Sequence, residues 1–156
     1  MKVFCLGLAM ALMSSTAGVA QREPGNAGCL IEQHARTCNW DGFKQLFSAA
    51  KTAAVEAPPM ERFADKQLKD LAKTLGKDVV GGGDHADVTF EVISADKDGV
   101  IFGPSDQDLA ELRVYAGGSS NGPLVWVETY RGQADRPWAS IVGSVILQFQ
   151  EHMAKG

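Results

Sequence analysis

Two stretches of alternating side chains constrain the fold of this chain more than any other feature. LAELRVY begins at Leu109 and LVWVETY begins at Leu124, and apolar and polar residues roughly alternate in both. Alternation with a period of two is typical of strands that are buried on one face. The residues between them, AGGSSNGP, have the Gly, Ser and Asn content of a hairpin connection. We therefore expect an antiparallel hairpin.

A long apolar stripe after the hairpin predicts a helix that covers it. In the segment that begins DRPW, Asp135 stands where an N-cap belongs and Pro137 would lie in the first turn. Apolar residues then recur at helical spacing and define one face: Trp138, Ile141, Val142, Val145, Ile146, Phe149 and Met153.

Two further segments complete the expected fold. MERFADKQLKDLAKTLGK follows a Pro-Pro pair, has apolar residues at helical spacing, and places Gly76 where a C-terminal cap belongs. ADVTFEVIS alternates from Val88 to Val92 and predicts a strand, after which DKDG at 96–99 supplies a turn and VIFG a short returning strand. The sequence therefore predicts an α+β domain with a mainly antiparallel sheet of three to five strands and two helices packed on one face.

Residues 40–57, WDGFKQLFSAAKTAAVEA, fit either of two structures. Their alanine content and the spacing of their apolar residues favour a helix. A strand from Phe43 to Ser48 followed by a loop fits nearly as well. The residue pattern leaves both possibilities open.

The first residues, MKVFCLGLAMALMSSTAGVA, have the three parts of a secretory signal peptide. Lys2 precedes an apolar run from Val3 to Met13, and small residues end at Ala20, where we expect cleavage. The run is shorter than the roughly 20 apolar residues of a membrane-spanning helix, and no later segment reaches that length. We therefore expect an exported protein without a membrane span, located in the periplasm or outside the cell.

Cys29 and Cys38 are the two cysteines that remain after residues 1–20 are removed. An even count in an exported protein predicts a disulfide, which would pin residues 21–39 as an arm on a single α+β domain of residues 40–156. Closing so short a loop would stabilise the fold by about 2–3 kcal/mol. Free thiols or a metal site are the alternatives. Lipidation at Cys29 does not fit, because polar residues separate it from the apolar run.

The net charge limits the kinds of partner. The chain carries −4 at pH 7, and loss of Lys2 would make the mature chain more negative by one. Binding to nucleic acid or to an anionic membrane depends on Lys and Arg that neutralise phosphates. We therefore expect no nucleic-acid partner and no anionic membrane partner. We also expect no cofactor.

GSSNG at 118–122 matches the Gly-x-Ser-x-Gly pattern of many esterases, which would make Ser120 a nucleophile. That pattern works only between a strand and a helix whose N-terminus helps to stabilise the oxyanion. Here Pro123 and another strand follow, and the only downstream histidine is His152 in the last expected helix. We therefore predict a hairpin loop and no catalytic residue.

Two other motifs have structural interpretations. GGGDH at 81–85 precedes a strand and lacks the Lys-Ser/Thr of a phosphate-binding loop, so we interpret it as a connector. DKDG resembles the start of a calcium loop, but Gln107 stands where the bidentate glutamate belongs. His85 with Asp84 and Asp87 has no known metal-ligand spacing, and we predict no metal.

The hairpin provides the candidate binding residues through its register. Pairing Tyr115 with Trp126 sets Arg113 opposite Glu128, which avoids the contact between two glutamates that the alternative register creates. In this register five residues face the helices: Ala110, Leu112, Val114, Val125 and Val127. The other face then carries Tyr115, Leu124, Trp126 and Tyr130.

An aromatic patch on the solvent side of a sheet often marks a binding site. Arg131, Arg136 and Trp138 follow the hairpin in sequence and would extend the patch. The alternative is that the arm or residues 40–57 cover this face, and the sequence favours neither.

Four segments give the chain a family resemblance: ADVTFEV, LRVY, LVWVETY and the closing ILQFQEHM. Over roughly residues 60–154 it resembles small exported bacterial envelope domains, among them lipoprotein-like domains of unknown function and the TolB amino-terminal-like fold. The resemblance implies a partner-binding or structural role in the envelope and no known catalytic residues. It also favours the strand for residues 40–57. Unlike the lipoprotein members, this chain lacks an acylation cysteine.

Three hypotheses for the function follow. The first is an exported, non-catalytic domain that binds a protein or another envelope macromolecule through Tyr115, Trp126, Tyr130, Arg131 and Arg136. The second is an inhibitor of a secreted hydrolase that inserts the loop 116–123 into an active site. The third is a small serine hydrolase that uses Ser120.

Overall fold

The computed structural model describes residues 28–31, 36–57, 62–81, 85–94, 109–131 and 137–156. Its elements in chain order are β1 (Cys29–Ile31), β2 (Arg36–Cys38), α1 (Trp40–Ala49), β3 (Thr52–Glu56), α2 (Arg62–Thr74), β4 (Asp78–Val79), β5 (Val88–Ser94), β6 (Leu109–Ala116), β7 (Leu124–Arg131) and α3 (Trp138–Lys155). Both expected helices and the strands expected from 88, 109 and 124 are present. The leader at 1–20, the DKDG turn, the VIFG strand and Arg136 lie outside the described residues.

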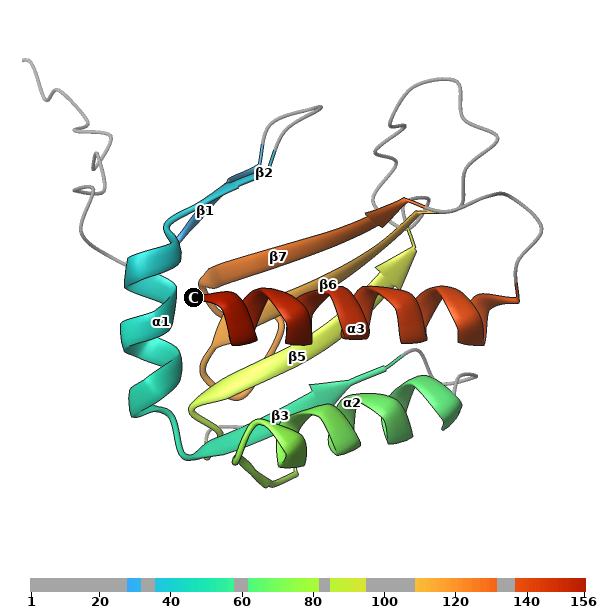
Figure 1. The fold of residues 1–156 in the computed structure, drawn as a ribbon. Helices are drawn as coiled ribbons and strands as arrows, with labels where there is room; N and C mark the ends of the chain where they lie inside the picture. Colours follow the sequence, from blue (N-terminus) through green and yellow to red (C-terminus); the bar gives the residue numbers. More distant parts are fainter. Residues whose placement is uncertain (1–27, 32–35, 58–61, 82–84, 95–108, 132–136) are drawn as a thin grey trace, which may run out of the picture.

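Five of the strands form one sheet in the order β4-β3-β5-β6-β7 (Figure 1). The pairs β5–β6 and β6–β7 are antiparallel, as expected. β3 is parallel to both β4 and β5. The chain leaves β3 through α2 before it returns to the sheet, and parallel neighbours need such a crossover. The structure therefore confirms the α+β fold and adds parallel pairing on one side of the sheet.

α2 and α3 run side by side in front of this sheet (Figure 1). α3 contacts β6 and β7, whereas α2 contacts β3, β4 and β5. The helix residues buried in these contacts are Ala64, Leu68, Leu71 and Ala72 on α2 and Ile141, Val142, Val145, Ile146 and Phe149 on α3. Each large apolar side chain contributes about 1.5–3 kcal/mol when it is fully buried. None of the helices in the described ranges is both long and apolar enough to cross a bilayer.

Residues 40–57 form a helix and then a strand, so the prediction of a strand from Phe43 to Ser48 is wrong. The side chain of Asn39 caps α1 by accepting a hydrogen bond from the backbone N–H of Gly42 at 3.1 Å. Phe43 and Phe47 then lie one turn apart on the buried face. Capping and helical spacing therefore decide the structure of this segment, and the strand begins only at Thr52.

Aromatic rings connect α1 to the rest of the core. Phe47 meets Phe90 of β5 and Phe149 of α3 edge to face, with ring centroids 6.1 and 6.5 Å apart. Phe43 lies 6.1 Å from Phe149 and 5.3 Å from Phe47. These distances are in the range at which aromatic pairs attract each other beyond their loss of exposed area.

Lys77 donates hydrogen bonds at the C-terminal ends of two helices, α1 and α2. Gly76 adopts the left-handed conformation (φ 74°), and the backbone N–H of Lys77 donates to the carbonyl oxygen of Ala72 at 2.9 Å, which forms the predicted C-cap of α2. The ammonium group of Lys77 donates to the carbonyl oxygens of Phe47 and Ala50 at 2.5 and 2.7 Å, at the end of α1. Burial of this group lowers the pKa of Lys77.

Cys29 and Cys38 form the predicted disulfide, which joins directly opposite residues of β1 and β2. The two strands make a separate two-stranded ribbon next to β7. Arg36 of this ribbon donates from Nε to a carboxylate oxygen of Glu111 at 3.1 Å. The ribbon is therefore closed by a covalent bond and attached to the main sheet by an ion pair.

Candidate functional site

The register of β6 and β7 differs from the predicted one and separates the aromatic residues. Tyr115 pairs with Leu124 and Val114 pairs with Trp126, so Val125 is an extra residue in a β-bulge. A bulge reverses the alternation of side chains, which a strict period of two does not foresee. The predicted common solvent face for Tyr115 and Trp126 is therefore wrong.

Trp126 lies on the helix side of the sheet. Its side chain is 7% exposed and stacks on Phe43, with ring centroids 5.2 Å apart and planes inclined by 26°. Tyr130 also faces this side and packs against the core while half-buried. Arg131 ends the strand and is exposed. The structure therefore brings Trp126 and Tyr130 to one side of the sheet and Tyr115 to the other.

Tyr115 lies on the face away from the helices and is 6% exposed. Its hydroxyl donates a hydrogen bond to Glu91 Oε2 at 2.9 Å. Burial is the largest cause that raises the pKa of Tyr115 to about 12, and the charge of Glu91 adds to it, while Arg113 acts in the opposite direction. Tyr115 is therefore part of a buried polar network.

Glu111 is the centre of that network. Its side chain is 1% exposed and receives hydrogen bonds from Arg113, at 3.0 Å from Nε and 2.7 Å from the terminal nitrogen, and from Arg36 at 3.1 Å. A buried carboxylate is costly unless cations and donors surround it, and here two guanidinium groups do so. We interpret the network as a structural feature that joins the ribbon to β6.

The loop that holds Ser120 connects β6 directly to β7, which confirms the hairpin connection. The backbone N–H of Ser120 donates to Glu56 Oε1 at 2.9 Å, and the carbonyl of Gly117 accepts from Thr89 Oγ1 at 2.7 Å. Both partners belong to the sheet face that carries Tyr115, so the loop is bound to that face. Within the described residues the Ser120 hydroxyl has no hydrogen bond to a histidine. The inhibitor and hydrolase hypotheses stay predictions.

Asp87 has a structural role at the start of β3. Its Oδ2 atom accepts from the backbone N–H groups of Lys51 and Thr52 at 2.7 and 2.9 Å, and from Thr52 Oγ1 at 3.0 Å. These hydrogen bonds, first that from the Thr52 backbone, lower the pKa of Asp87. His85 is exposed, and the described part of the chain holds no group of three residues suited to bind a metal ion.

The C-terminal turns of α3 contribute a cluster that the sequence did not indicate. His152 stacks on Trp40 of α1, with ring centroids 4.6 Å apart, and its Nδ1 lies 3.2 Å from Glu128 Oε2. Glu128 is 6% exposed and also accepts from Trp126 Nε1 at 3.3 Å. The cluster joins α1, β7 and α3 around the buried Glu128, while the side chain of His152 is 44% exposed.

The β1–β2 ribbon presents two exposed large apolar side chains, one of them the most exposed of the described residues. Leu30 is 70% exposed and Ile31 is 45% exposed. Figure 1 shows the ribbon extending away from the five-stranded sheet beyond β7, on the side opposite α2. A disulfide-closed ribbon with exposed aliphatic side chains is a candidate contact surface. Sequence reasoning missed it because CLI is too short to show a period, although the disulfide spacing marked the segment.

The chain matches no family model and no curated protein. Among solved structures it is similar to two dodecamers of PelC from Paraburkholderia phytofirmans, one of them a single-substitution variant. Identity is 14% and 15%, and the TM-score is 0.39 for both. Each match covers 63% of this chain, with 84% and 82% of the PelC chains. Similarity at this level identifies no family, so the function is argued from this chain alone.

Proposed function

We propose that the protein is an exported, non-catalytic domain that binds a macromolecular partner through the β1–β2 ribbon. The observation that carries this proposal is the exposure of Leu30 and Ile31 on a ribbon closed by the Cys29–Cys38 disulfide. The disulfide and the signal-peptide pattern of residues 1–20 support export.

Pre-organisation makes the ribbon suitable for binding. A three-residue strand pair is marginal by itself in water. The disulfide and the Arg36–Glu111 ion pair restrict it before any partner arrives, so less conformational entropy is lost on association. Burying Leu30 and Ile31 would then contribute about 1.5–3 kcal/mol for each side chain that becomes fully covered.

The partner that fits this ribbon is a protein with an apolar depression. Leu30 and Ile31 are consecutive, so their side chains project from opposite faces of β1. Two apolar anchors on opposite faces suit a cleft that encloses the ribbon, because such anchors contribute most when they fill desolvated pockets.

The test compares the full exported chain with a Leu30→Ser/Ile31→Ser variant. Both are used as bait on envelope extracts of the native host, and the captured proteins are quantified by mass spectrometry. We expect a specific set of proteins to be lost with the variant and retained with Lys51→Ser, a change at an exposed residue outside the ribbon. Equal capture by all three chains, with unchanged thermal unfolding, would exclude the ribbon as the contact surface.

A further inference from the structure

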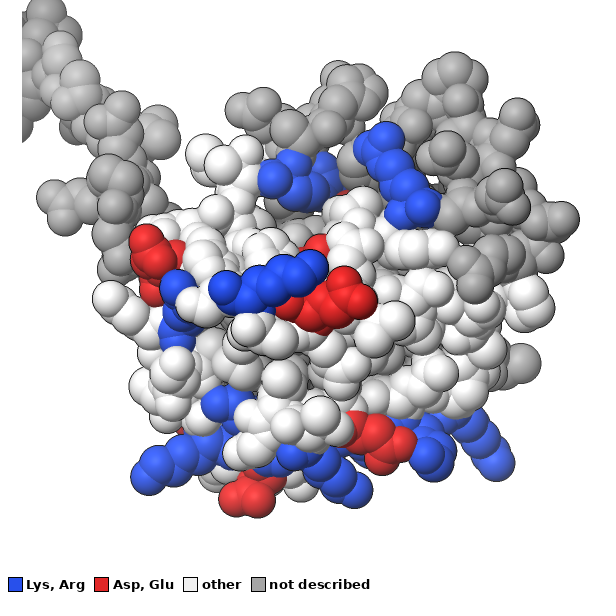
Figure 2. Space-filling view, in the orientation of Figure 1, with Lys and Arg blue, Asp and Glu red and all other residues white. Residues whose placement is uncertain are grey.

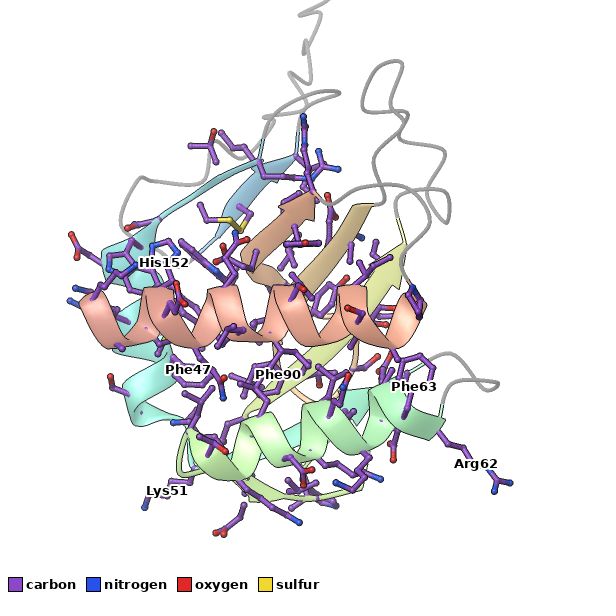
Figure 3. The ribbon with its side chains drawn as sticks, turned by 45° about the vertical axis from the view of Figure 1, so that its right-hand side comes forward. Phe47, Lys51, Arg62, Phe63, Phe90 and His152 are labelled. Atoms are coloured by element: carbon purple, nitrogen blue, oxygen red, sulfur yellow. A yellow bond between two sulfur atoms is a disulfide. The ribbon has the colours of Figure 1, made fainter. Side chains whose placement is uncertain are left out.

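The loop between β6 and β7 folds back onto the face of the sheet that is turned away from α2 and α3. Figure 3 shows Phe90 of β5 between these two helices, so its neighbour Thr89 points to the opposite face. There Thr89 Oγ1 donates to the carbonyl oxygen of Gly117 at 2.7 Å. The backbone N–H of Gly117 donates to the carbonyl oxygen of Asp87 at 2.8 Å. These hydrogen bonds hold the first half of the loop on the sheet.

A carboxylate holds the second half of the loop. Glu56 at the end of β3 accepts at Oε1 from the backbone N–H of Ser120 at 2.9 Å. Ser120 belongs to a tight turn, in which the backbone N–H of Gly122 donates to the carbonyl oxygen of Ser119 at 3.0 Å. Hydrogen bonds to a charged acceptor are roughly twice as strong as those between neutral groups. Glu56 therefore restrains this turn more firmly than a neutral acceptor would.

The packing of the turn places a chemically labile pair of residues at an exposed position. Residue 122 has to be a glycine, because a Cβ atom there would collide with the backbone carbonyl oxygen of Ala116. Asn121, the residue before it, is exposed. Asparagine is thermolabile in proteins, and most of all before glycine, because no side chain then hinders attack of the next backbone nitrogen on the asparagine amide.

We propose that Asn121 is a site of spontaneous deamidation and that Glu56 controls its rate. The backbone nitrogen of Gly122 bonds to Cγ of Asn121, the Cγ–Nδ2 bond breaks, and the proton lost by the Gly122 nitrogen leaves with the amide group as ammonia. Water then opens the resulting succinimide ring at either of its carbonyl groups and gives aspartate or isoaspartate. Water is the only co-reactant.

The folded turn opposes the first step of this reaction. The N–H group of Gly122 is engaged with Ser119, so the turn has to open before the nitrogen can attack. A reaction that proceeds only from a locally open form has a rate proportional to the population of that form. Ser120 lies within the turn and is held by Glu56. Removal of this carboxylate should therefore increase the open population and the rate of deamidation.

Conversion to isoaspartate should release the loop from the sheet. It lengthens the main chain by a methylene group immediately before Gly122, which already packs tightly against Ala116. It also adds a carboxylate next to Ser120, whose N–H is bound by Glu56, and the two like charges repel each other. The site is therefore a slow, irreversible switch of the loop. It is separate from the ribbon and does not depend on the function proposed above.

The test follows conversion at position 121 in the full chain at mildly alkaline pH, by peptide mass spectrometry and by labelling with an isoaspartyl methyltransferase. We expect Glu56→Ala to accelerate conversion about tenfold, which corresponds to about 1.4 kcal/mol of lost restraint. Thr89→Val removes the hydroxyl that binds Gly117 and should also accelerate it, whereas Thr89→Ser should not. Asp70→Ala is the matched control and should retain the wild-type rate. It removes a carboxylate that pairs with Lys66 on α2, where Figure 2 shows Lys and Arg gathered along the lower edge of the molecule.

Hydrogen exchange tests the release of the loop separately from the rate. In converted protein isolated by ion-exchange chromatography, the amide of Ser120 should exchange faster than in unconverted protein. Asn121→Asp adds the carboxylate without lengthening the main chain and should have a smaller effect. Equal conversion rates in wild type, Glu56→Ala and Thr89→Val, all folded by circular dichroism, would overturn the role of the loop contacts. Absence of conversion in both wild type and Glu56→Ala would overturn the site, and unchanged exchange at Ser120 would overturn the switch.

Discussion

The two faces of the central sheet are both shielded from solvent, but by different chemistry. On the helix side, Phe90 and Trp126 meet rings from α1 and α3. On the other side, Glu91, Glu111 and Tyr115 are engaged in hydrogen bonds and ion pairs. The stability of the apolar face depends on the area that it buries and the volume that it fills, whereas the stability of the polar face depends on the presence of each hydrogen-bond or ion-pair partner. Low exposure alone therefore does not identify the hydrophobic core of this sheet.

The largest effect should come from the apolar face. Phe149→Ala removes a ring that is fully buried between Phe43, Phe47 and Phe90. We expect a loss of about 3–5 kcal/mol in the free energy of unfolding, since a cavity is left behind. Urea unfolding followed by circular dichroism measures it. Leu147→Ala, on the exposed side of the same helix, is the control and should change the value by less than about 1 kcal/mol.

On the polar face, we expect a similar loss in the free energy of unfolding, and further substitutions should reverse it. Glu111→Ala leaves Arg36 and Arg113 without their carboxylate, and we expect a loss of about 3 kcal/mol. The triple change Arg36→Met/Glu111→Leu/Arg113→Met removes the charges together, so most of this stability should return. Unfolding in urea measures both variants. A triple variant that is as unstable as Glu111→Ala would show that the network contributes to stability beyond compensating its own buried charges.

The dependence of stability on pH tests whether Tyr115 is buried on the polar face. Its pKa is about 12 in the folded protein against an ordinary 10.0, so between these values the unfolded chain has released a proton that the folded protein retains. Stability should therefore fall as the pH rises through this window, by roughly 2–3 kcal/mol at its upper end. Tyr115→Phe should lack this decrease when unfolding is measured at stepwise pH.

Lys77 makes the pH comparison sharper, because its effect has the opposite sign. Its pKa is lowered by burial, so the folded protein releases this proton first and gains stability as the pH rises toward the ordinary value of lysine. This gain is present in both wild type and Tyr115→Phe. The difference between the two chains therefore isolates the tyrosine, and identical pH profiles would contradict the buried position of its hydroxyl.

The smallest effect is expected at Ser120. Its contact with Glu56 uses the backbone N–H, which Ser120→Ala retains, so stability should change by less than about 0.5 kcal/mol. Labelling with a serine-reactive fluorophosphonate is the accompanying measurement. Labelling of the wild type that disappears in Ser120→Ala would favour the hydrolase hypothesis over a structural loop.

Much of the fold was predictable because its signals are local and repeated. The periods around Val88, Leu109 and Leu124, the C-cap at Gly76 and the spacing of the two cysteines each identified an element that the structure contains. α1 was ambiguous because its length is close to that of a strand with a loop. The capping contact of Asn39 and the positions of Phe43 and Phe47 decide it only once tertiary packing is known.

The candidate site was not predictable, for a reason that can be traced to one residue. The extra residue Val125 changes the face of the sheet on which Trp126 lies. The residue pattern of β7 does not identify its buried face, because the charged residue Glu128 is buried among polar partners on the helix side. Charge pairing across a hairpin predicts the register only where the charges are exposed on one face, and Glu111 and Glu128 are both buried. The ribbon residues Leu30 and Ile31 gave no signal, since exposure depends on the placement of the whole strand pair.

The dual role of Lys77 links the ends of two helices that are far apart in sequence. The same residue closes α2 with its backbone and α1 with its side chain, so fraying of one end removes the restraint on the other. Amide hydrogen exchange should therefore report the last turns of α1 and α2 as one cooperative opening unit, with similar protection that collapses together when the ammonium group is lost.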